Sequence, residues 1–311
     1  MLDEFLFKQN GLNYLRWCQK NPIGKIPKDV AKEGAGENRI PFTHYANSLP
    51  VYLISAKMIN ELKKTKAFIL DIGCGTGRNI SFVKDNVNKK NYYYYGIDYS
   101  NACIKYARIQ YRKQGVNFIQ YEGKIFPFPD KSFDFIISSH VIEHIKKKDA
   151  LLYLSEISRV LKKDGIAVIG TPNRKYCQDL FYLNKNDELK YRFILPHEHE
   201  YYYEELKKLF DQKKLFKKYV FYGTTNKINR YLMTEGAKKI KPRPDFLSRL
   251  KFNIYSYLRI NPRLQDFMAK LGTELMLWRM KKNYYDIITS TYLVKNKYVK
   301  DADNFVVIAF K

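Results

Sequence analysis

The chain has 311 residues, enough for one large domain or a domain with additions, and its 45% hydrophobic content excludes wholesale disorder. It has no apolar run near the ~18 residues that cross a bilayer, no signal-peptide pattern and no close cysteine pair, so we expect a cytoplasmic protein. The net charge is +25, and residues 212–300 carry 21 Lys+Arg against 5 Asp+Glu, which fits either an anionic partner or a lysine-rich composition.

The predicted elements begin with a helical lead-in, clearest as an apolar stripe over residues 49–64. From residue 66 onward, short apolar runs alternate with amphipathic segments, which is the pattern of βαβ units in a largely parallel sheet. We expect strands at 66–73, 92–100, 116–123, 132–140, 166–173 and 303–311, and helices from Arg78, at 101–114 and at 150–165, the last ended by Gly165.

Glycines and an acid after the first strand form the strongest signal in the sequence. The stretch "ILDIGCGTGRN" ends a strand at Asp71 and then turns through Gly73, Gly75 and Gly77. Glycines there allow a tight turn and a close approach of the backbone to a ligand. Asp98 ends the next strand, where a carboxylate can accept hydrogen bonds from both ribose hydroxyls. A nicotinamide cofactor fits less well, because an acid precedes the first glycine and the GxGxxG spacing is missing.

These motifs, taken in order, resemble the class I S-adenosylmethionine-dependent methyltransferases of the methyltransferase-11/23-like branch. The matching stretches are "ILDIGCGTG", "GIDYS", "YEGKIFPFPDKSFDFIISSHVIEHI", "EISRVLKKDGIAVIGTPN" and "HEHEYYYEELKKLF", within residues 66–222, and "DNFVVIAFK" fits the closing strand. The resemblance implies an α/β, Rossmann-like fold with a seven-stranded, mostly parallel sheet and helices on both faces. The predicted divisions are a helical lead-in (1–65), the cofactor-binding core (66–224), a basic helical insertion (225–285) and a return to the core (286–311).

The resemblance also assigns residues to the cofactor S-adenosylmethionine. Asp71 would anchor the glycine loop and orient the methionine ammonium, and Glu122 stands where the family often has an aspartate that contacts the adenine amino group. The whole predicted cofactor set is Asp71, Gly73, Gly75, Gly77, Asp98 at the ribose, Tyr99 along the adenine, Glu122 and Ser139.

Two histidine-rich stretches, "SSHVIEHI" and "LPHEHEYYYEEL", follow strands at the edge where open α/β sheets bind ligands. Three interpretations remain open: a brace for a neighbouring loop, a general base at His140 or His197, or a divalent metal ion on Glu143, His144 and His197. The third rests on a resemblance to small-RNA 2′-O-methyltransferases, which carry Glu-x-x-Glu-His here. His140 replaces the first glutamate, so the sequence does not favour a metal, although a histidine-rich set would suit Mn²⁺, Fe²⁺ or Zn²⁺.

The sequence lacks the motifs that mark two other classes of methyl acceptor. No Asn/Asp-Pro-Pro-Tyr/Phe follows the fourth strand and no catalytic cysteine pair is present, since Cys74 lies in the cofactor loop. We therefore expect O-methylation of a small-molecule, glycan or lipid-linked biosynthetic intermediate. The alternatives are a metal-assisted RNA 2′-O-methyltransferase and a non-catalytic partner subunit that kept the fold, and the intact glycine loop with Asp98 argues against the latter.

The insertion at 225–285 mixes aromatic and basic residues. It fits a helix packed on the core, a dimer contact, or peripheral attachment to an anionic membrane at its cytoplasmic face. No RNA-binding module is recognisable, so nucleic acid is the less favoured partner, and the sequence predicts no oligomeric state.

Overall fold

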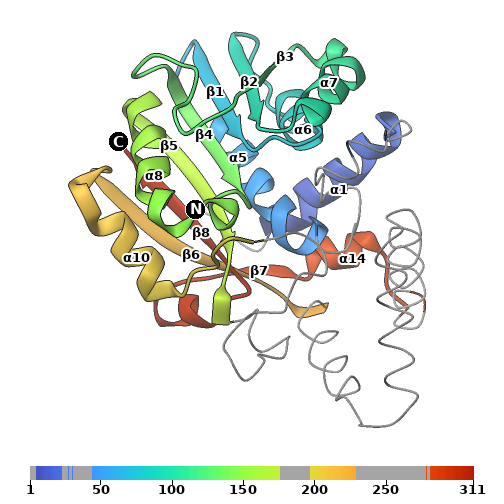
Figure 1. The fold of residues 1–311 in the computed structure, drawn as a ribbon. Coiled ribbons are helices and arrows are strands. Elements are labelled where there is room, and N and C mark those ends of the chain that lie inside the picture. The colour runs from blue at the N-terminus through green and yellow to red at the C-terminus, as the bar shows by residue number, and fades with distance from the viewer. Residues whose placement is uncertain are drawn as a thin grey trace, which may run out of the picture.

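The computed structural model describes residues 5–22, 44–175, 197–228 and 281–311, together with positions 27, 30 and 278. Within these residues, an eight-stranded sheet runs in the order β3-β2-β1-β4-β5-β8-β6-β7 (Figure 1). The strands are β1 Ala67–Ile72, β2 Tyr92–Asp98, β3 Val116–Gln120, β4 Phe133–Ser139, β5 Leu161–Pro172, β6 Lys218–Asn226, β7 Thr291–Val294 and β8 Asn304–Phe310.

Helices cover both faces of this sheet (Figure 1). One hydrophobic cluster joins the sheet to five helices, α1 Phe5–Lys20, α5 Leu49–Asn60, α6 Arg78–Asn86, α7 Asn101–Gln110 and α14 Tyr284–Thr289. A second cluster joins the other face to α8 Ala150–Val160 and α10 Tyr203–Asp211. Because both faces are covered, every residue of β4 is buried, which explains its continuous apolar sequence.

The sheet confirms the predicted α/β, Rossmann-like class. β1 pairs in parallel with β2 and β4, and β8 is antiparallel to both β5 and β6. The closing strand is therefore reversed, as expected. The sheet has eight strands rather than seven, because the short stretch at β7 adds to β6 along Gly223–Asn226. Four residues of mixed polarity give too weak a periodic signal to predict such an edge strand.

The predicted helix at 150–165 is too long. α8 ends at Val160, and the fully buried Leu161 already pairs with Phe133 of β4. The chain then turns at Asp164, whose φ is 60°, before regular pairing resumes at Ile166. Gly165 thus lies within β5 and does not end the helix. Burial of Leu161 in the sheet outweighs the helical tendency of the lysines that follow.

The other predicted boundaries fall close to the observed ones. The stripe at 49–64 forms a helix only as far as Asn60, and the helix predicted at 101–114 ends at Gln110, followed by a 3₁₀ turn at Arg112–Gln114. Most of the predicted insertion at 225–285, and Cys177, lie outside the described residues. The division into 1–65, 66–224, 225–285 and 286–311 therefore stays a prediction.

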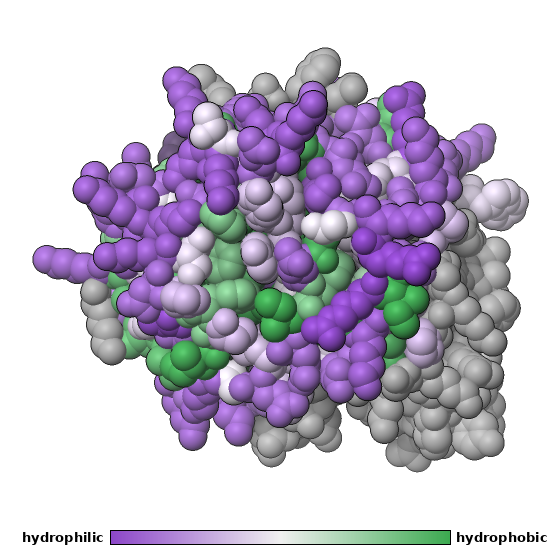
Figure 2. All heavy atoms as spheres, turned by 90° about the horizontal axis from the view of Figure 1, so that it is seen from above, coloured by the Kyte–Doolittle hydropathy of each residue, from purple (hydrophilic) through white to green (hydrophobic). Residues whose placement is uncertain are grey.

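Most of the surface seen in Figure 2 is hydrophilic and surrounds a small hydrophobic area. This face of the described residues offers no broad apolar patch. Among the described residues, we find no helix with the length and apolar character needed to span a bilayer.

Candidate active site

The glycine loop between β1 and α6 is an open cradle. Gly75 has a φ of 54°, and a Cβ added there would meet no heavy atom within 4 Å. Gly77 has a φ of 78° and lies against Phe118 and Ala107, which a Cβ would meet at 2.5 Å and 2.9 Å. The loop therefore presents bare backbone to open space on one side while packing tightly on the other, as the approach of a polar ligand requires.

Asp98 holds this loop in place. Its carboxylate accepts hydrogen bonds from the amide of Gly75 at 2.8 Å and the amide of Ser100 at 2.9 Å, so it orients the cradle directly. The placement fits the predicted ribose contact, because Asp98 lies at the end of β2 beside the cradle.

Asp71 and Ser139 tie the same edge to helix α5. The buried Asp71 accepts from the Tyr52 hydroxyl at 3.2 Å to each carboxylate oxygen. The hydroxyl of Ser139 donates to the carbonyl of Ser48, at the start of α5, at 3.3 Å. Both contacts fix the ends of neighbouring strands β1 and β4 around the glycine loop. The role predicted for Asp71 at the cofactor stays a prediction.

Tyr99 and Glu122 lie at the exposed rim. Tyr99 is 74% exposed, so its ring is free to cover a flat ligand group. The exposed Glu122 accepts a hydrogen bond of 2.7 Å from Gln120, whose amide also donates to the Tyr99 carbonyl at 3.4 Å. This bond links the rim residues of β2 and β3. Together with the cradle and Asp98, the predicted set fits a nucleoside bearing an amino-acid group.

The first histidine stretch contacts the glycine loop directly. A Cβ on Gly73 would lie 2.4 Å from Cγ2 of Val141, so the Val141 side chain packs against the bare backbone of Gly73. The preceding residue, His140, has a φ of 57°, which is strained for a residue other than glycine. This conformation sends the chain from β4 over the loop and into the 3₁₀ turn Ile142–His144.

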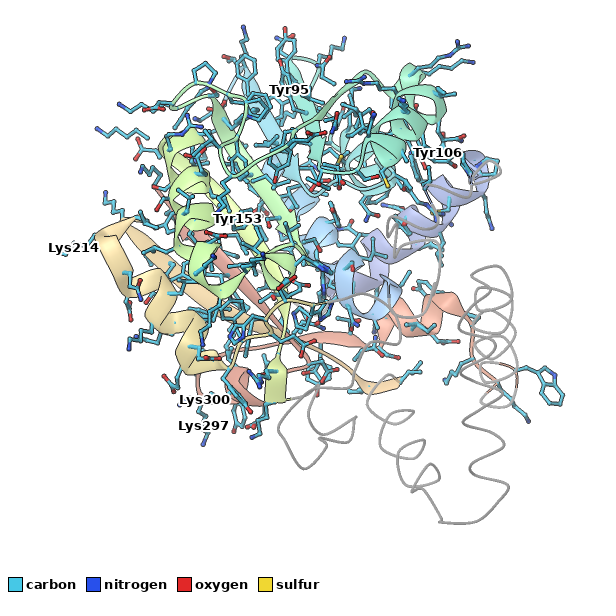
Figure 3. All side chains as sticks on the ribbon, in the orientation of Figure 1. Tyr95, Tyr106, Tyr153, Lys214, Lys297 and Lys300 are labelled. Carbon is cyan, nitrogen blue, oxygen red and sulfur yellow. The ribbon has the colours of Figure 1, made fainter. Side chains whose placement is uncertain are left out.

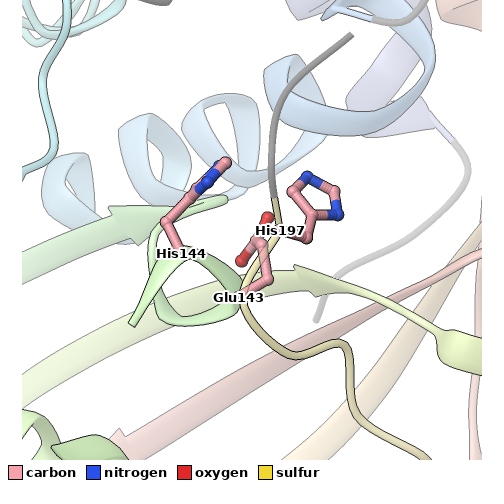
Figure 4. Close-up of side chains that lie close together, drawn as sticks. All are labelled: Glu143, His144 and His197. Carbon is pink, nitrogen blue, oxygen red and sulfur yellow. The ribbon is translucent and has the colours of Figure 1, made fainter. Parts of the chain in front are cut away.

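Glu143, His144 and His197 converge on one point beyond this turn (Figure 4). One ligand-capable atom from each of the three side chains lies within 4.8 Å of the other two. The rings of His144 and His197 meet edge to face, with centroids 4.8 Å apart. The structure therefore brings together the three residues that the sequence offered as a possible metal-binding set.

Backbone hydrogen bonds join the two stretches. The carbonyl of Glu143 accepts from the amides of Glu198 and His199, at 2.8 Å and 3.0 Å. The amide of Arg174 donates to the carbonyl of Tyr201 at 3.0 Å, which fastens the second stretch to the end of β5. The convergence is thus fixed by the main chain.

Each ring or carboxylate in the cluster has its own orienting partner. Glu143 accepts from Thr171 at 3.0 Å through Oε2, and its Oε1 lies 3.1 Å from Nδ1 of His140. Nδ1 of His197 lies 2.6 Å from Oε1 of Glu200. The latter contact leaves Nε2 of His197 as the atom available to a ligand or proton.

The electrostatics favour an anion at Glu143 and a cation at His197. Burial raises the pKa of Glu143, but His140, His144 and His197 outweigh it and lower the pKa to about 2. Burial lowers the pKa of His197, but the bond to Glu200 and the charges of Glu143 and Glu200 outweigh it, so the net pKa is raised. A positive charge is therefore stabilised beside a fully buried carboxylate.

Thr171 and Glu200 were missed by the sequence predictions. Thr171 lies in "GTPN" at the end of β5, and Glu200 follows the two histidines of "HEHE". Their polar character at the ligand-binding edge was the available signal. Ser138 was missed as well: its hydroxyl shares a 2.7 Å hydrogen bond with Tyr153 of α8, which lies against the sheet in Figure 3.

A separate cleft of about 350 Å³ lies between α1, α5 and α6. Its walls include Lys57, Asn60 and Asn86, at the ends of α5 and α6 away from the glycine loop. None of the predicted cofactor residues or histidines lines it. The chemistry-bearing side chains and this cleft are therefore at opposite edges of the sheet.

Comparisons with known proteins bear on the same region. A family model described as "Methyltransferase domain" matches residues 70–169. Two proteins of Mycolicibacterium smegmatis are similar: a probable S-adenosylmethionine-dependent methyltransferase, 31% identical over 108 residues (34% of this chain, 38% of that protein), and a fatty-acid O-methyltransferase, 30% identical over 111 residues (35% and 38%). The phthiotriol/phenolphthiotriol dimycocerosates methyltransferase of Mycobacterium tuberculosis is 29% identical over 100 residues (31% and 34%). The chain thus spans less than two-fifths of the length of these relatives.

Proposed function

Since residues 70–169 match the methyltransferase-domain family model, we propose that this chain is a class I S-adenosylmethionine-dependent methyltransferase that transfers a methyl group to an oxygen of a small-molecule, glycan or lipid-linked acceptor. The observation that carries the proposal is the direct contact of Val141 with Gly73, which sets a histidine and glutamate cluster beside the cofactor cradle. The fatty-acid O-methyltransferase similar to this chain supports an oxygen acceptor on a lipid.

Residues of the cradle would hold the cofactor in this reaction. The backbone at Gly75 has room for the amino-acid group, and Asp98, which holds the Gly75 amide at the end of β2, would accept from the ribose hydroxyls. Tyr99 and Glu122, at the exposed rim, would contact the adenine. S-adenosylmethionine supplies a methyl group on a sulfonium, which is already a good leaving group, so the protein's main tasks are positioning the acceptor and helping its proton to leave.

The histidine and glutamate cluster performs the second task. A hydroxyl acceptor must lose its proton as the new bond forms, and an imidazole or carboxylate within hydrogen-bond reach is the usual group for this. His140 and His197 remain the predicted bases. Their Nδ1 atoms face Glu143 and Glu200, so each ring has a fixed orientation toward the cluster.

Peripheral contact with an anionic membrane is part of the proposal. Lys295, Lys297 and Lys300 are exposed, and Lys297 lies over the ring of Tyr298, which is 61% exposed. Lysines next to an exposed aromatic ring suit the headgroup region of a bilayer. A lipid-linked acceptor would be met at such a surface.

A labelled-methyl assay tests the proposed function. The chain is incubated with S-adenosylmethionine carrying a labelled methyl group and with lipid extracts, and the products are treated with base to separate esters from ethers. We expect label on an oxygen, loss of transfer with Asp98→Ala, and retention with Lys89→Glu, at the opposite edge of the sheet. Label found only on nitrogen, carbon or sulfur would contradict the oxygen assignment.

A further inference from the structure

We infer that Glu143, His144 and His197 form a binding site for a divalent transition-metal ion of the Zn²⁺ type. The binding of the ion stands on the arrangement of these side chains, while its part in methyl transfer rests on the proposed function. In this assignment His197 serves as a ligand rather than as a free base.

The spacing of the three side chains suits one ion. Their ligand atoms lie within 4.8 Å of one another. Ligands about 2.0–2.1 Å from a tetrahedral ion are about 3.4 Å apart, so a small rotation of each side chain closes the set. Figure 4 shows the carboxylate and the two rings pointing toward a common space.

The groups that orient these side chains are those expected around a metal ion. The ring nitrogen of a metal-binding histidine that does not touch the ion usually donates a hydrogen bond to a carboxylate, and metal-binding carboxylates are themselves hydrogen-bonded. Here Oε1 of Glu200 lies within hydrogen-bond distance of Nδ1 of His197, at 2.6 Å, and the hydroxyl of Thr171 donates to Oε2 of Glu143 at 3.0 Å. Oε1 of Glu143 has no hydrogen-bond partner among the described residues, and the contact with Glu200 leaves Nε2 as the ring nitrogen of His197 that can bind an ion. A loop brace alone would not require two orienting partners outside the set.

Burial argues that the carboxylate has a cationic partner. Glu143 is completely buried, and Oε1 has no hydrogen-bond donor with good geometry, since its 3.1 Å contact with His140 satisfies only a distance criterion. A buried carboxylate oxygen without a hydrogen bond is costly unless a cation neutralises it. An ion between Glu143 and the two imidazoles removes that cost.

The donor set selects the kind of ion. One carboxylate and two imidazoles favour Zn²⁺ or Co²⁺, whereas Mg²⁺ prefers an all-oxygen shell. Three protein ligands leave a coordination position free, which is the arrangement of catalytic rather than structural zinc sites.

The free position is where the acceptor hydroxyl would bind. An ion there lowers the pKa of the hydroxyl, so its proton passes to solvent. The acceptor oxygen then bonds to the methyl carbon as the sulfur–carbon bond breaks, and the sulfonium becomes a neutral thioether.

Metal titration of the untagged full chain tests the assignment. The protein is stripped with a chelator, dialysed, and titrated with Zn²⁺, Co²⁺ and Mg²⁺ by calorimetry, and the Co²⁺ form is examined by visible absorption. We expect one equivalent of Zn²⁺ or Co²⁺, an intense tetrahedral Co²⁺ band, and much weaker Mg²⁺ binding. Glu200→Gln, which keeps all three ligands, should weaken Zn²⁺ binding by about 10- to 100-fold.

Matched histidine variants separate the site from adventitious binding. His197→Gln should abolish the Co²⁺ band, while His199→Gln, two residues away and paired with Glu205 instead, should keep it. No Zn²⁺ or Co²⁺ binding by the folded chain, or equal binding by His197→Gln, would overturn the metal site. Methyl transfer that persists in chelator would refute the ion's role in the reaction but leave the proposed function standing. Zn²⁺ binding without any methyl transfer would refute the proposed function but leave the metal site standing.

Discussion

Two glycines of the cofactor loop differ in what surrounds them. Gly75 faces open space, whereas Gly77 is pressed against Phe118 and Ala107. Both have a positive φ, so an added Cβ strains either position by about 1–2 kcal/mol. Only Gly77 also meets side chains that cannot easily retreat. We therefore propose that Gly75 serves ligand binding, whereas Gly77 serves packing.

Alanine substitutions should separate these two roles. Gly75→Ala should weaken S-adenosylhomocysteine binding by tenfold or more, on the order of 1.4 kcal/mol, because the new methyl group fills the cradle. Its melting temperature should fall only slightly. Gly77→Ala should instead lower the melting temperature strongly. Calorimetry and thermal unfolding on both variants check this, and equal loss of stability would contradict the division.

At the scale of elements, strand β4 is anchored at its start by a buried charge. Asp134 is almost fully buried and accepts from Lys64 at 2.6 Å, Lys162 at 2.7 Å and the amide of Phe68 at 2.9 Å. Burial raises the pKa of Asp134, but these hydrogen bonds outweigh it and the net pKa is lowered. The carboxylate thus joins the segment that follows α5 to β1, β4 and β5, at the edge opposite the glycine loop.

Asp134→Asn should destabilise the fold in a pH-dependent way. At neutral pH we expect a loss of about 1–3 kcal/mol, as for a buried charged group that loses its partners. A folded pKa below the unfolded one gives stability that is present above the unfolded value and lost as pH falls through the folded value. The difference from the native chain should therefore shrink below about pH 4.

Urea unfolding of the native chain and Asp134→Asn, at neutral and acidic pH, measures this difference. Asp130→Asn is the matched control, because its carboxylate pairs with Arg159 at the surface and should contribute less than about 1 kcal/mol. A penalty for Asp134→Asn that is unchanged at acidic pH would show that shape, not charge, explains its effect.

Parallel topology explains how much the sequence could predict. The strand ends at Asp71, Asp98 and Ser139 must share one edge of a parallel sheet, so motifs far apart in sequence could be assigned to one site. The bonds from Tyr52 to Asp71, from Thr171 to Glu143 and from Glu200 to His197 could not be predicted. They depend on how separate segments pack, which no local pattern encodes.

For the molecule as a whole, the dominant property is its charge of +25. Part of the excess surrounds the connection between β7 and β8, where Lys297 and Lys300 lie at the lower edge of Figure 3. Lys300 pairs with Glu204, while Lys297 lies over the ring of Tyr298. We propose that this connection is the part of the described surface that contacts an anionic membrane.

Vesicle sedimentation should show this contact. We expect the protein to bind phosphatidylglycerol vesicles and to dissociate from them as the salt concentration rises. It should not bind phosphatidylcholine vesicles. The double variant Lys295→Glu and Lys297→Glu should bind about 10- to 30-fold more weakly, at about 1 kcal/mol for each lysine. The matched double variant Lys89→Glu and Lys90→Glu, exposed at the opposite edge, should bind like the native chain, and equal losses in both would refute a defined contact surface.

Calorimetric titration with S-adenosylhomocysteine tests the central claim most directly. We predict saturable binding by the native chain and an affinity about 10- to 100-fold lower for Asp98→Ala, because hydrogen bonds to a charged group contribute about 1.5–3 kcal/mol. Asp130→Asn should bind as tightly as the native chain. A folded native chain that produces no binding heat, or an Asp98→Ala variant with unchanged affinity, would contradict the claim that this edge of the sheet holds the methyl donor.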